Sequence, residues 1–152
     1  MKLWVDADAC PGPVRDILVR ASQRVKVPVV FVANKALTLP RSELVSSVRV
    51  PGGPDVADRY ITEQAQAGDL AVTQDIPLAA LLVPRGVVVI DPRGELFTDE
   101  NISERLSVRD FMQELRDSGV VTGGPSGFSA HDRQQFAASL DRELTRLLKS
   151  RP

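Results

Sequence analysis

The chain is poor in the residues that build disulfides, zinc sites and aromatic surfaces. Its 152 residues include one Cys, one His, one Trp, one Tyr and five Phe. A single Cys cannot close an internal disulfide, and one Cys with one His cannot form a structural zinc site. Because most of the few aromatic residues fall in apolar stripes, the sequence offers no platform on which bases could stack. It therefore gives no support to sequence-specific reading of nucleic acid.

The chain also lacks an excess of one charge and a long apolar run. Nineteen Lys and Arg face twenty Asp and Glu, for a net charge of −1, so a polyanionic partner would have to meet a local basic patch. The longest apolar run, around 87–90, is too short to span a membrane. Asp6 interrupts the N-terminal apolar stretch where a signal peptide would continue. We therefore predict a cytoplasmic protein without a membrane span.

What the chain does have is enough apolar residues for one packed domain. A content of 43% apolar residues over 152 positions fits a single domain, 1–152. The predicted strands cover residues 3–5, 27–32, 47–50, 70–73 and 87–90. Several of them are continuously apolar, which is typical of parallel strands covered on both faces. The pattern predicts an α/β fold with an open, mostly parallel sheet flanked by helices.

Helical patterns fill the segments between the strands and the last third of the chain. Apolar spacing and Pro or Gly boundaries predict helices over about 14–21, 54–66 and 77–83. In the last third, 107–110 and 129–132 both resemble capping boxes with Asp in the place of Glu. One apolar stripe follows each of them. We therefore predict two C-terminal amphipathic helices within 107–150 that pack on the core.

Five aspartates fall where an α/β sheet usually binds ligands. Asp6 and Asp8 follow the first predicted strand, and Asp75 follows the fourth. Asp55 and Asp58 are three residues apart and therefore share one face of a helix. Open α/β sheets bind ligands beyond the carboxyl ends of their strands. These carboxylates converge if the first and fourth strands are neighbours.

Converging carboxylates raise one another's pKa and need a counter-charge. Mg²⁺ or Mn²⁺ is the simplest one, because such a hard cation accepts one or two carboxylates directly and keeps several waters. A metal site of this kind suits phosphodiester hydrolysis. The plain alternative is that each acid only caps a helix. Asp55 and Asp75 both stand at predicted helix starts, where a carboxylate complements the free N–H groups.

Several strings along the chain resemble a known family. They are Val5-Asp-Ala-Asp-Ala-Cys-Pro11, Asp55-Val-Ala-Asp58-Arg-Tyr-Ile61, Gly68-Asp-Leu-Ala-Val-Thr-Gln-Asp75, Pro92-Arg-Gly94, Asn101-Ile102, Arg109, Gly124-Pro125, Phe128, Asp132-Arg133 and Phe136. Together they cover essentially the whole chain and resemble the YaiI/YqxD family. That family is in turn similar to PIN domains, the Mg²⁺- or Mn²⁺-dependent ribonucleases. The resemblance implies a PIN-like fold.

In the PIN pattern, one acid ends the first strand, a second lies on a central helix and a third follows a Thr-x-Asp turn. Their matches here are Asp6, either Asp55 or Asp58, and Asp75. Asp91 follows a later strand and is either the fourth acid of the pattern or a simple strand exit. The resemblance implies a Mg²⁺- or Mn²⁺-dependent ribonuclease, with single-stranded RNA as the substrate.

The residues and the resemblance together define a candidate site. The predicted catalytic residues are Asp6, Asp8, Asp58 and Asp75, with Asp8 additional to the PIN pattern. Asp6, Asp8 and Asp75 are the predicted metal ligands, and Asp55 and Thr73 are predicted to support them or to contact the substrate.

Two other classes of function stay open. One is a PIN-like protein that binds a metal, a nucleotide or a partner without catalysis. The other is a haloacid-dehalogenase-like phosphatase, with Asp6 as nucleophile and Asp8 as acid and base. Cys10 has no His near it in sequence and is interpreted as a packing residue, and His131 as a capping or solvated residue. The basic stripes within 20–24 and 142–146 are interpreted as solvated helix faces.

Overall fold

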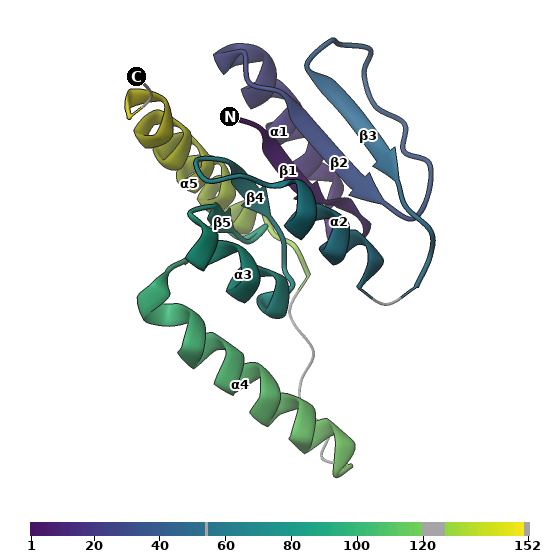
Figure 1. The fold of residues 1–152 in the computed structure, drawn as a ribbon, viewed down its shortest axis with the longest axis vertical. Coiled ribbons are helices and arrows are strands. Elements are labelled where there is room, and N and C mark those ends of the chain that lie inside the picture. Colours follow the sequence, from purple (N-terminus) through teal and green to yellow (C-terminus); the bar gives the residue numbers. More distant parts are fainter. Residues whose placement is uncertain (54, 120–126, 151–152) are drawn as a thin grey trace.

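A computed structural model describes residues 1–53, 55–119 and 127–150, which fold around one sheet (Figure 1). Its strands are β1 (Leu3–Asp6), β2 (Val29–Ala33), β3 (Val45–Arg49), β4 (Leu70–Val72), β5 (Val88–Ile90) and β6 (Leu96–Phe97). Its α-helices are α1 (Gly12–Val25), α2 (Val56–Gln64), α3 (Ile76–Leu82), α4 (Asp99–Asp117) and α5 (Ala130–Lys149). Short 3₁₀ turns, η1 (Ala7–Ala9) and η2 (Val83–Arg85), follow β1 and α3.

The sheet is open and mostly parallel, as the sequence predicts. Its strand order is β3-β2-β1-β4-β5-β6, and only β6 within it runs antiparallel, against β5. The chain moves outward from β1 to β3 on one side and then crosses to β4 on the other. The order therefore reverses between β1 and β4, which is the position where doubly wound sheets bind ligands.

Alternating residues of the strands face two separate apolar cores. Leu3 and Val5 of β1 face a core that includes residues of α1 and α5, whereas Trp4 between them faces a core built with α2 and α3. This alternation is the normal consequence of the period of two in a strand. The result is a three-layer arrangement with helices on both faces of the sheet (Figure 1), and it confirms the predicted α/β, PIN-like class.

The first C-terminal helix begins earlier than the sequence analysis predicts. The predicted cap at Ser107 is wrong, because Ser107 lies in the middle of α4. The helix starts instead after Thr98, whose Oγ1 accepts from the Asn101 N–H (3.2 Å) while Asn101 Oδ1 accepts from the Thr98 N–H (2.8 Å). This is a capping box with Asn in the third position, and it places the start of the helix nine residues before the predicted cap at Ser107.

Only the first turns of α4 contribute a buried apolar residue. Ile102 belongs to the core with α3, whereas Val108 and Phe111 are 54% and 58% exposed. Figure 1 shows α4 running past α3 and extending away from the sheet. The sequence predicts that the apolar stripe of this helix packs on the core. Val108 and Phe111 of that stripe are instead left exposed by the part of the chain that the structure describes.

The second C-terminal helix begins where the sequence predicts. Ser129 Oγ accepts from the Asp132 N–H (3.1 Å), and Asp132 Oδ2 accepts from the Ser129 N–H (3.0 Å). The β5–β6 turn lies directly against this helix. A Cβ at Gly94, where φ is +90°, would lie 2.5 Å from the carbonyl oxygen of Gln135, so only glycine allows this close approach.

Most other boundaries differ from the predicted ones by one or two residues, but α1 runs to Val25, four residues beyond the predicted end. Helix α2 begins at Val56, and Pro54, expected in its first turn, lies outside the described residues. The antiparallel strand β6 was not predicted, because two residues carry no readable alternation. No helix in the described ranges is both long and apolar enough to cross a membrane.

Candidate functional site

The first and fourth predicted strands are neighbours, so their carboxyl ends lie side by side. Val5 of β1 is in register with Val72 of β4. Asp6 ends β1, and Thr73 and Asp75 follow β4. The predicted convergence of the acids requires β1 and β4 to be neighbours, and they are neighbours at the switch point of the sheet.

Thr73 connects Asp6 to the loop after β4. The buried Thr73 hydroxyl donates to Asp6 Oδ2 (3.0 Å), and its oxygen accepts from the Asp75 N–H (2.9 Å). Burial raises the pKa of Asp6, as do the nearby charges of Asp75 and Asp8, while the hydroxyl of Thr73 lowers it. Asp6 is therefore a partly buried carboxylate with one donor and two like-charged neighbours.

Asp75 combines a structural contact with a contact to a second acid. Its Oδ1 accepts from the Leu78 N–H (3.0 Å), which makes it the N-cap of α3. It also shares a side-chain hydrogen bond with Asp58, in the first turn of α2. Asp75 is therefore a helix cap, as the simpler interpretation predicts, and it also contacts a second acid.

Asp58 has the largest shift among the aspartates at this edge. Burial raises its pKa to about 7, with further contributions from the hydrogen bond and charge of Asp75 and from the charges of Asp6 and Asp55. Two carboxylates in such a contact cannot both ionise without cost, so at neutral pH they tend to share a proton. Three acids from β1, α2 and the β4–α3 loop are thereby brought together.

Asp8 and Asp55 lie at the margin of this cluster. Asp8 is exposed in η1, and its Oδ2 accepts from the Asn34 N–H (2.9 Å) after β2. Asp55 stands at the N-cap of α2 with φ of +63°, and its side chain makes no capping hydrogen bond. Asp55 and Asp58 line a cavity of about 410 Å³ between α2 and α3. Both marginal acids add negative charge to the cluster: Asp8 acts on Asp6, and Asp55 on Asp58.

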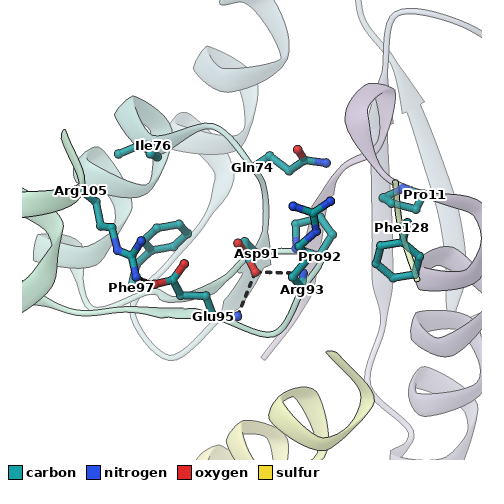
Figure 2. Close-up of a pocket in the computed structure, with 10 residues that line it drawn as sticks. All are labelled: Pro11, Gln74, Ile76, Asp91, Pro92, Arg93, Glu95, Phe97, Arg105 and Phe128. Atoms are coloured by element: carbon teal, nitrogen blue, oxygen red, sulfur yellow. Dashed lines mark hydrogen bonds and ion pairs between the residues drawn. The ribbon is translucent and has the colours of Figure 1, made fainter. Parts of the chain in front are cut away.

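Asp91 has a structural role in the next turn along the sheet. Its Oδ1 accepts from the N–H groups of Arg93 and Glu95, both at 2.9 Å. Burial raises the pKa of Asp91, and the N–H and the charge of Arg93 lower it. It lines a separate cavity together with residues on either side of Asp75 (Figure 2). Asp91 therefore holds the β5–β6 turn and does not join the acids at β1 and β4.

The acids can be compared with what a divalent cation requires. Within the described ranges, no group of three or more His, Cys, Asp or Glu side chains is placed to hold one ion. The predicted ligand set of Asp6, Asp8 and Asp75 is thus not assembled as one cage. Mg²⁺ commonly takes one or two carboxylates and keeps its other waters. Asp6 and Asp58, whose pKa values are raised mainly by burial and further by nearby acidic charges, fit a cation of that open kind.

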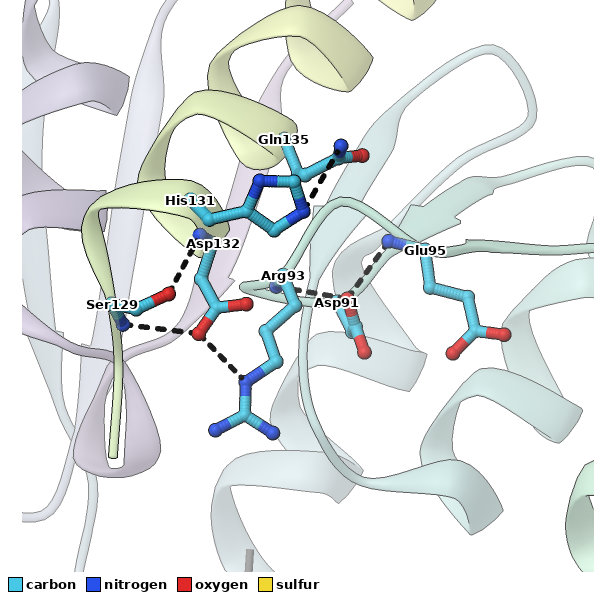
Figure 3. A network of polar contacts seen from close by, with 7 residues as sticks. All are labelled: Asp91, Arg93, Glu95, Ser129, His131, Asp132 and Gln135. Atoms are coloured by element: carbon cyan, nitrogen blue, oxygen red, sulfur yellow. Dashed lines mark hydrogen bonds and ion pairs between the residues drawn. The ribbon is translucent and has the colours of Figure 1, made fainter. Parts of the chain in front are cut away.

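The other candidates keep the simpler interpretations given above. Burial raises the pKa of the Cys10 thiol to about 12, so it is not a reactive thiolate. His131 is exposed on α5, and its ring lies 3.5 Å from the Gln135 amide (Figure 3). The basic stripes are far from the acids: Arg24 pairs with Asp141 across α1 and α5, and Arg146 pairs with the buried Glu143.

Cations outside the two predicted basic stripes line the cavities on either side of the acids. Arg15 and Lys35 line a cavity of about 470 Å³ on the β2 side of the acids. Arg93 and Arg105 line the cavity of about 300 Å³ on the β5 side. They come from four separate segments, so no run or helical stripe in the sequence marks them as a group. Only the strand order brings them to one edge.

Sheet, helices and acidic cluster together define a PIN-like α/β protein whose candidate site lies at the switch point of the sheet. The chain belongs to the YaiI/YqxD family, since the model of "Uncharacterized BCR, YaiI/YqxD family" matches residues 4–146.

The curated relatives are of the same length. A "UPF0178 protein" of Myxococcus xanthus is 76% identical over 152 residues, covering 100% of this chain and 99% of the relative. Proteins of the same name from Syntrophobacter fumaroxidans and Trichlorobacter lovleyi are 55% and 57% identical over 149 residues, covering 98% of this chain and 97% of each relative. No solved structure matches the chain significantly.

Proposed function

We propose that this protein is a Mg²⁺- or Mn²⁺-dependent phosphodiesterase that cleaves single-stranded RNA at the acidic cluster. The observation that supports the proposal is the convergence of Asp6, Asp58 and Asp75 at the switch point, with the pKa of Asp58 raised to about 7. A stability role alone does not account for three acids that face one another at one edge of the sheet, because their charges repel.

The roles of the acids follow from their contacts. Asp6 and Asp75 would hold the metal, because each has a carboxylate at the meeting point of β1 and β4. Asp8 and Asp58 would orient water, and the Thr73 hydroxyl would fix the direction of Asp6. A bound Mg²⁺ or Mn²⁺ supplies polarisation of the phosphoryl oxygen and a lowered pKa of water.

The charges around the cluster favour a polyanionic substrate. The acids alone would repel a phosphodiester, but Arg15 and Lys35 line a cavity on the β2 side of them. A strand that crosses the carboxyl edge would meet this positive charge beside the acids. Arg93 and Arg105, on the β5 side, pair with Asp132 and Glu95 and add little net charge. A single strand suits this edge better than a duplex, because its bases can turn away from the backbone.

The proposal is tested by cleavage of labelled single-stranded RNA. Cleavage should require Mg²⁺ or Mn²⁺, stop in EDTA, and fall by at least about 100-fold in Asp6→Asn, a loss near 2.7 kcal/mol of barrier stabilisation. Asp141→Asn on α5 is the matched control and should cleave like the wild type, because Asp141 pairs with Arg24 away from the cluster.

Three results would contradict the proposal. Equal cleavage by wild type and Asp6→Asn would indicate a contaminating ribonuclease. No cleavage of RNA or DNA by either protein would favour a binding protein without catalysis. Capture of a phosphoaspartate at Asp6 would favour the phosphatase chemistry.

A further inference from the structure

The cavity on the β5 side lies directly beside the acidic cluster, because the loop that carries Asp75 forms part of its wall. Gln74 and Ile76, on either side of Asp75, line this cavity of about 300 Å³. Its other described lining residues are Pro11, Asp91, Pro92, Arg93, Glu95, Phe97, Arg105 and Phe128. A volume of about 300 Å³ is at the lower end of the range for small-molecule sites, so it suits one nucleoside-sized group.

Five of the ten described residues that line this cavity are apolar, and the two phenylalanine rings come from opposite sides of it. Figure 2 shows Pro11 and Phe128 together on one side and Phe97 with Arg105 on the other, with Asp91 between them. Phe97 is buried in the core, whereas Phe128 is half-buried. Flat apolar surfaces such as these are what a planar ring packs against.

The charges that line the cavity are already compensated. Arg105 forms an ion pair with Glu95, and Arg93 Nε lies 3.5 Å from Asp132 Oδ2. Asp91 is engaged by the N–H groups of Arg93 and Glu95 (Figure 3). Two cations and two acids therefore line the cavity, which does not favour a phosphate as its occupant. A neutral ring fits better, because it can lie against the half-buried Phe128 without adding charge to the cavity.

We propose that this cavity binds one nucleobase of a single-stranded nucleic acid, next to the phosphodiester that the aspartates would hold. The inference rests on the proposed function for the position of that phosphodiester. The base would lie against Phe128 and Pro11, and its ribose and phosphate would lead toward the loop that carries Asp75. Such a cavity would fix the register of the strand on the acids.

Binding of nucleoside 5′-monophosphates, measured by NMR in metal-free buffer with EDTA, tests this inference without cleavage. Nucleotides should shift resonances of the cavity residues, and ribose 5-phosphate and inorganic phosphate should not. Phe128→Ala should weaken nucleotide binding by at least about 5-fold, since stacking on one aromatic side chain contributes about 1–3 kcal/mol. Phe111→Ala, an exposed phenylalanine on α4, is the matched control and should bind like the wild type.

The possible failures are distinguishable from those of the proposed function. Asp6→Asn should bind nucleotides normally although it does not cleave RNA. If ribose 5-phosphate binds as tightly as the nucleotides, or if binding is unchanged in both Phe128→Ala and Gln74→Ala, the base pocket is wrong even if RNA is cleaved. Gln74 is exposed in its loop, so its variant should fold if Phe128→Ala does not. If nucleotide binding depends on these residues but RNA is not cleaved, the result would support the base-binding cavity and contradict the proposed phosphodiesterase activity.

Discussion

The two ends of the central strands carry buried acids in opposite circumstances. At the amino end, Asp69 precedes β4 and is only 7% exposed. Its Oδ1 accepts from the Lys2 N–H (3.0 Å), and its Oδ2 accepts from Trp4 Nε1 (3.0 Å) and from the Gln66 N–H (2.9 Å). One buried carboxylate therefore accepts from three N–H groups and ties the start of β1 to the turn before β4.

At the carboxyl end, the acids face one another. Asp6 receives one hydroxyl, and Asp58 shares its hydrogen bond with Asp75. The comparison shows that burial of an aspartate alone does not indicate function. An acid enclosed by N–H donors stabilises the fold, whereas acids that face one another repel, and a bound cation could relieve that repulsion.

The largest expected effect on stability is at the amino end. Asp69→Ala should lower the free energy of unfolding by about 3 kcal/mol, because it leaves the indole N–H and two backbone N–H groups without their acceptor in a buried place. Urea unfolding measures this. Asp6→Asn, the matched change at the carboxyl end, should be no less stable than the wild type. A larger loss in Asp6→Asn than in Asp69→Ala would reverse the comparison.

The next effect is metal binding at the carboxyl end. Mn²⁺ at about 100 times its dissociation constant should stabilise the native state by about 2.7 kcal/mol, which raises the Tm by roughly 5–10 °C in a domain of this size. Asp75→Asn should remove most of this gain without destabilising the metal-free protein, because one repulsive charge is gone. Calorimetry with the same metal dependence in both proteins would argue against a site at Asp75.

A smaller effect concerns the pH dependence of stability. The pKa of Asp58 is about 7 in the folded protein and about 4 in an unfolded chain. The unfolded state therefore loses its proton first, and the stabilisation from protonated Asp58 is lost as the pH rises from about 4 through 7. Because solvent screens a half-exposed pair, we expect a loss of about 1 kcal/mol. Urea unfolding of Asp58→Asn between pH 5 and 8 should show a flatter dependence, and an identical slope would contradict the pairing.

The smallest expected effect on stability is at Asp8. Asp8→Ala removes one exposed hydrogen bond to Asn34, so the free energy of unfolding should change by about 0.5 kcal/mol. If Asp8 orients water in the proposed reaction, RNA cleavage should still fall by about 10-fold. A variant that loses stability and activity in proportion would assign Asp8 to the fold alone.

The sequence predicts the sheet well because β-branched runs bounded by Pro, Gly and Asp define its strands. It also places Asp6 and Asp75 at strand ends, but that these ends are neighbours comes from the strand order of the structure. It cannot predict that Asp8 is held by the N–H of Asn34 or that Asp91 is used in a turn, because these contacts depend on loop geometry. The start of α4 was missed for a local reason: Thr98 and Asn101 cap a helix as Ser and Glu do.

The most direct test of the account is a crystal of the protein soaked in Mn²⁺ and measured at the manganese absorption edge. The account predicts one strong anomalous peak within coordination distance of the carboxylates of Asp6 or Asp75, and its loss in Asp75→Asn. A difference map without a peak at the carboxyl ends of β1 and β4, in crystals where Mn²⁺ binds other carboxylates, would contradict the metal site and the chemistry proposed for it.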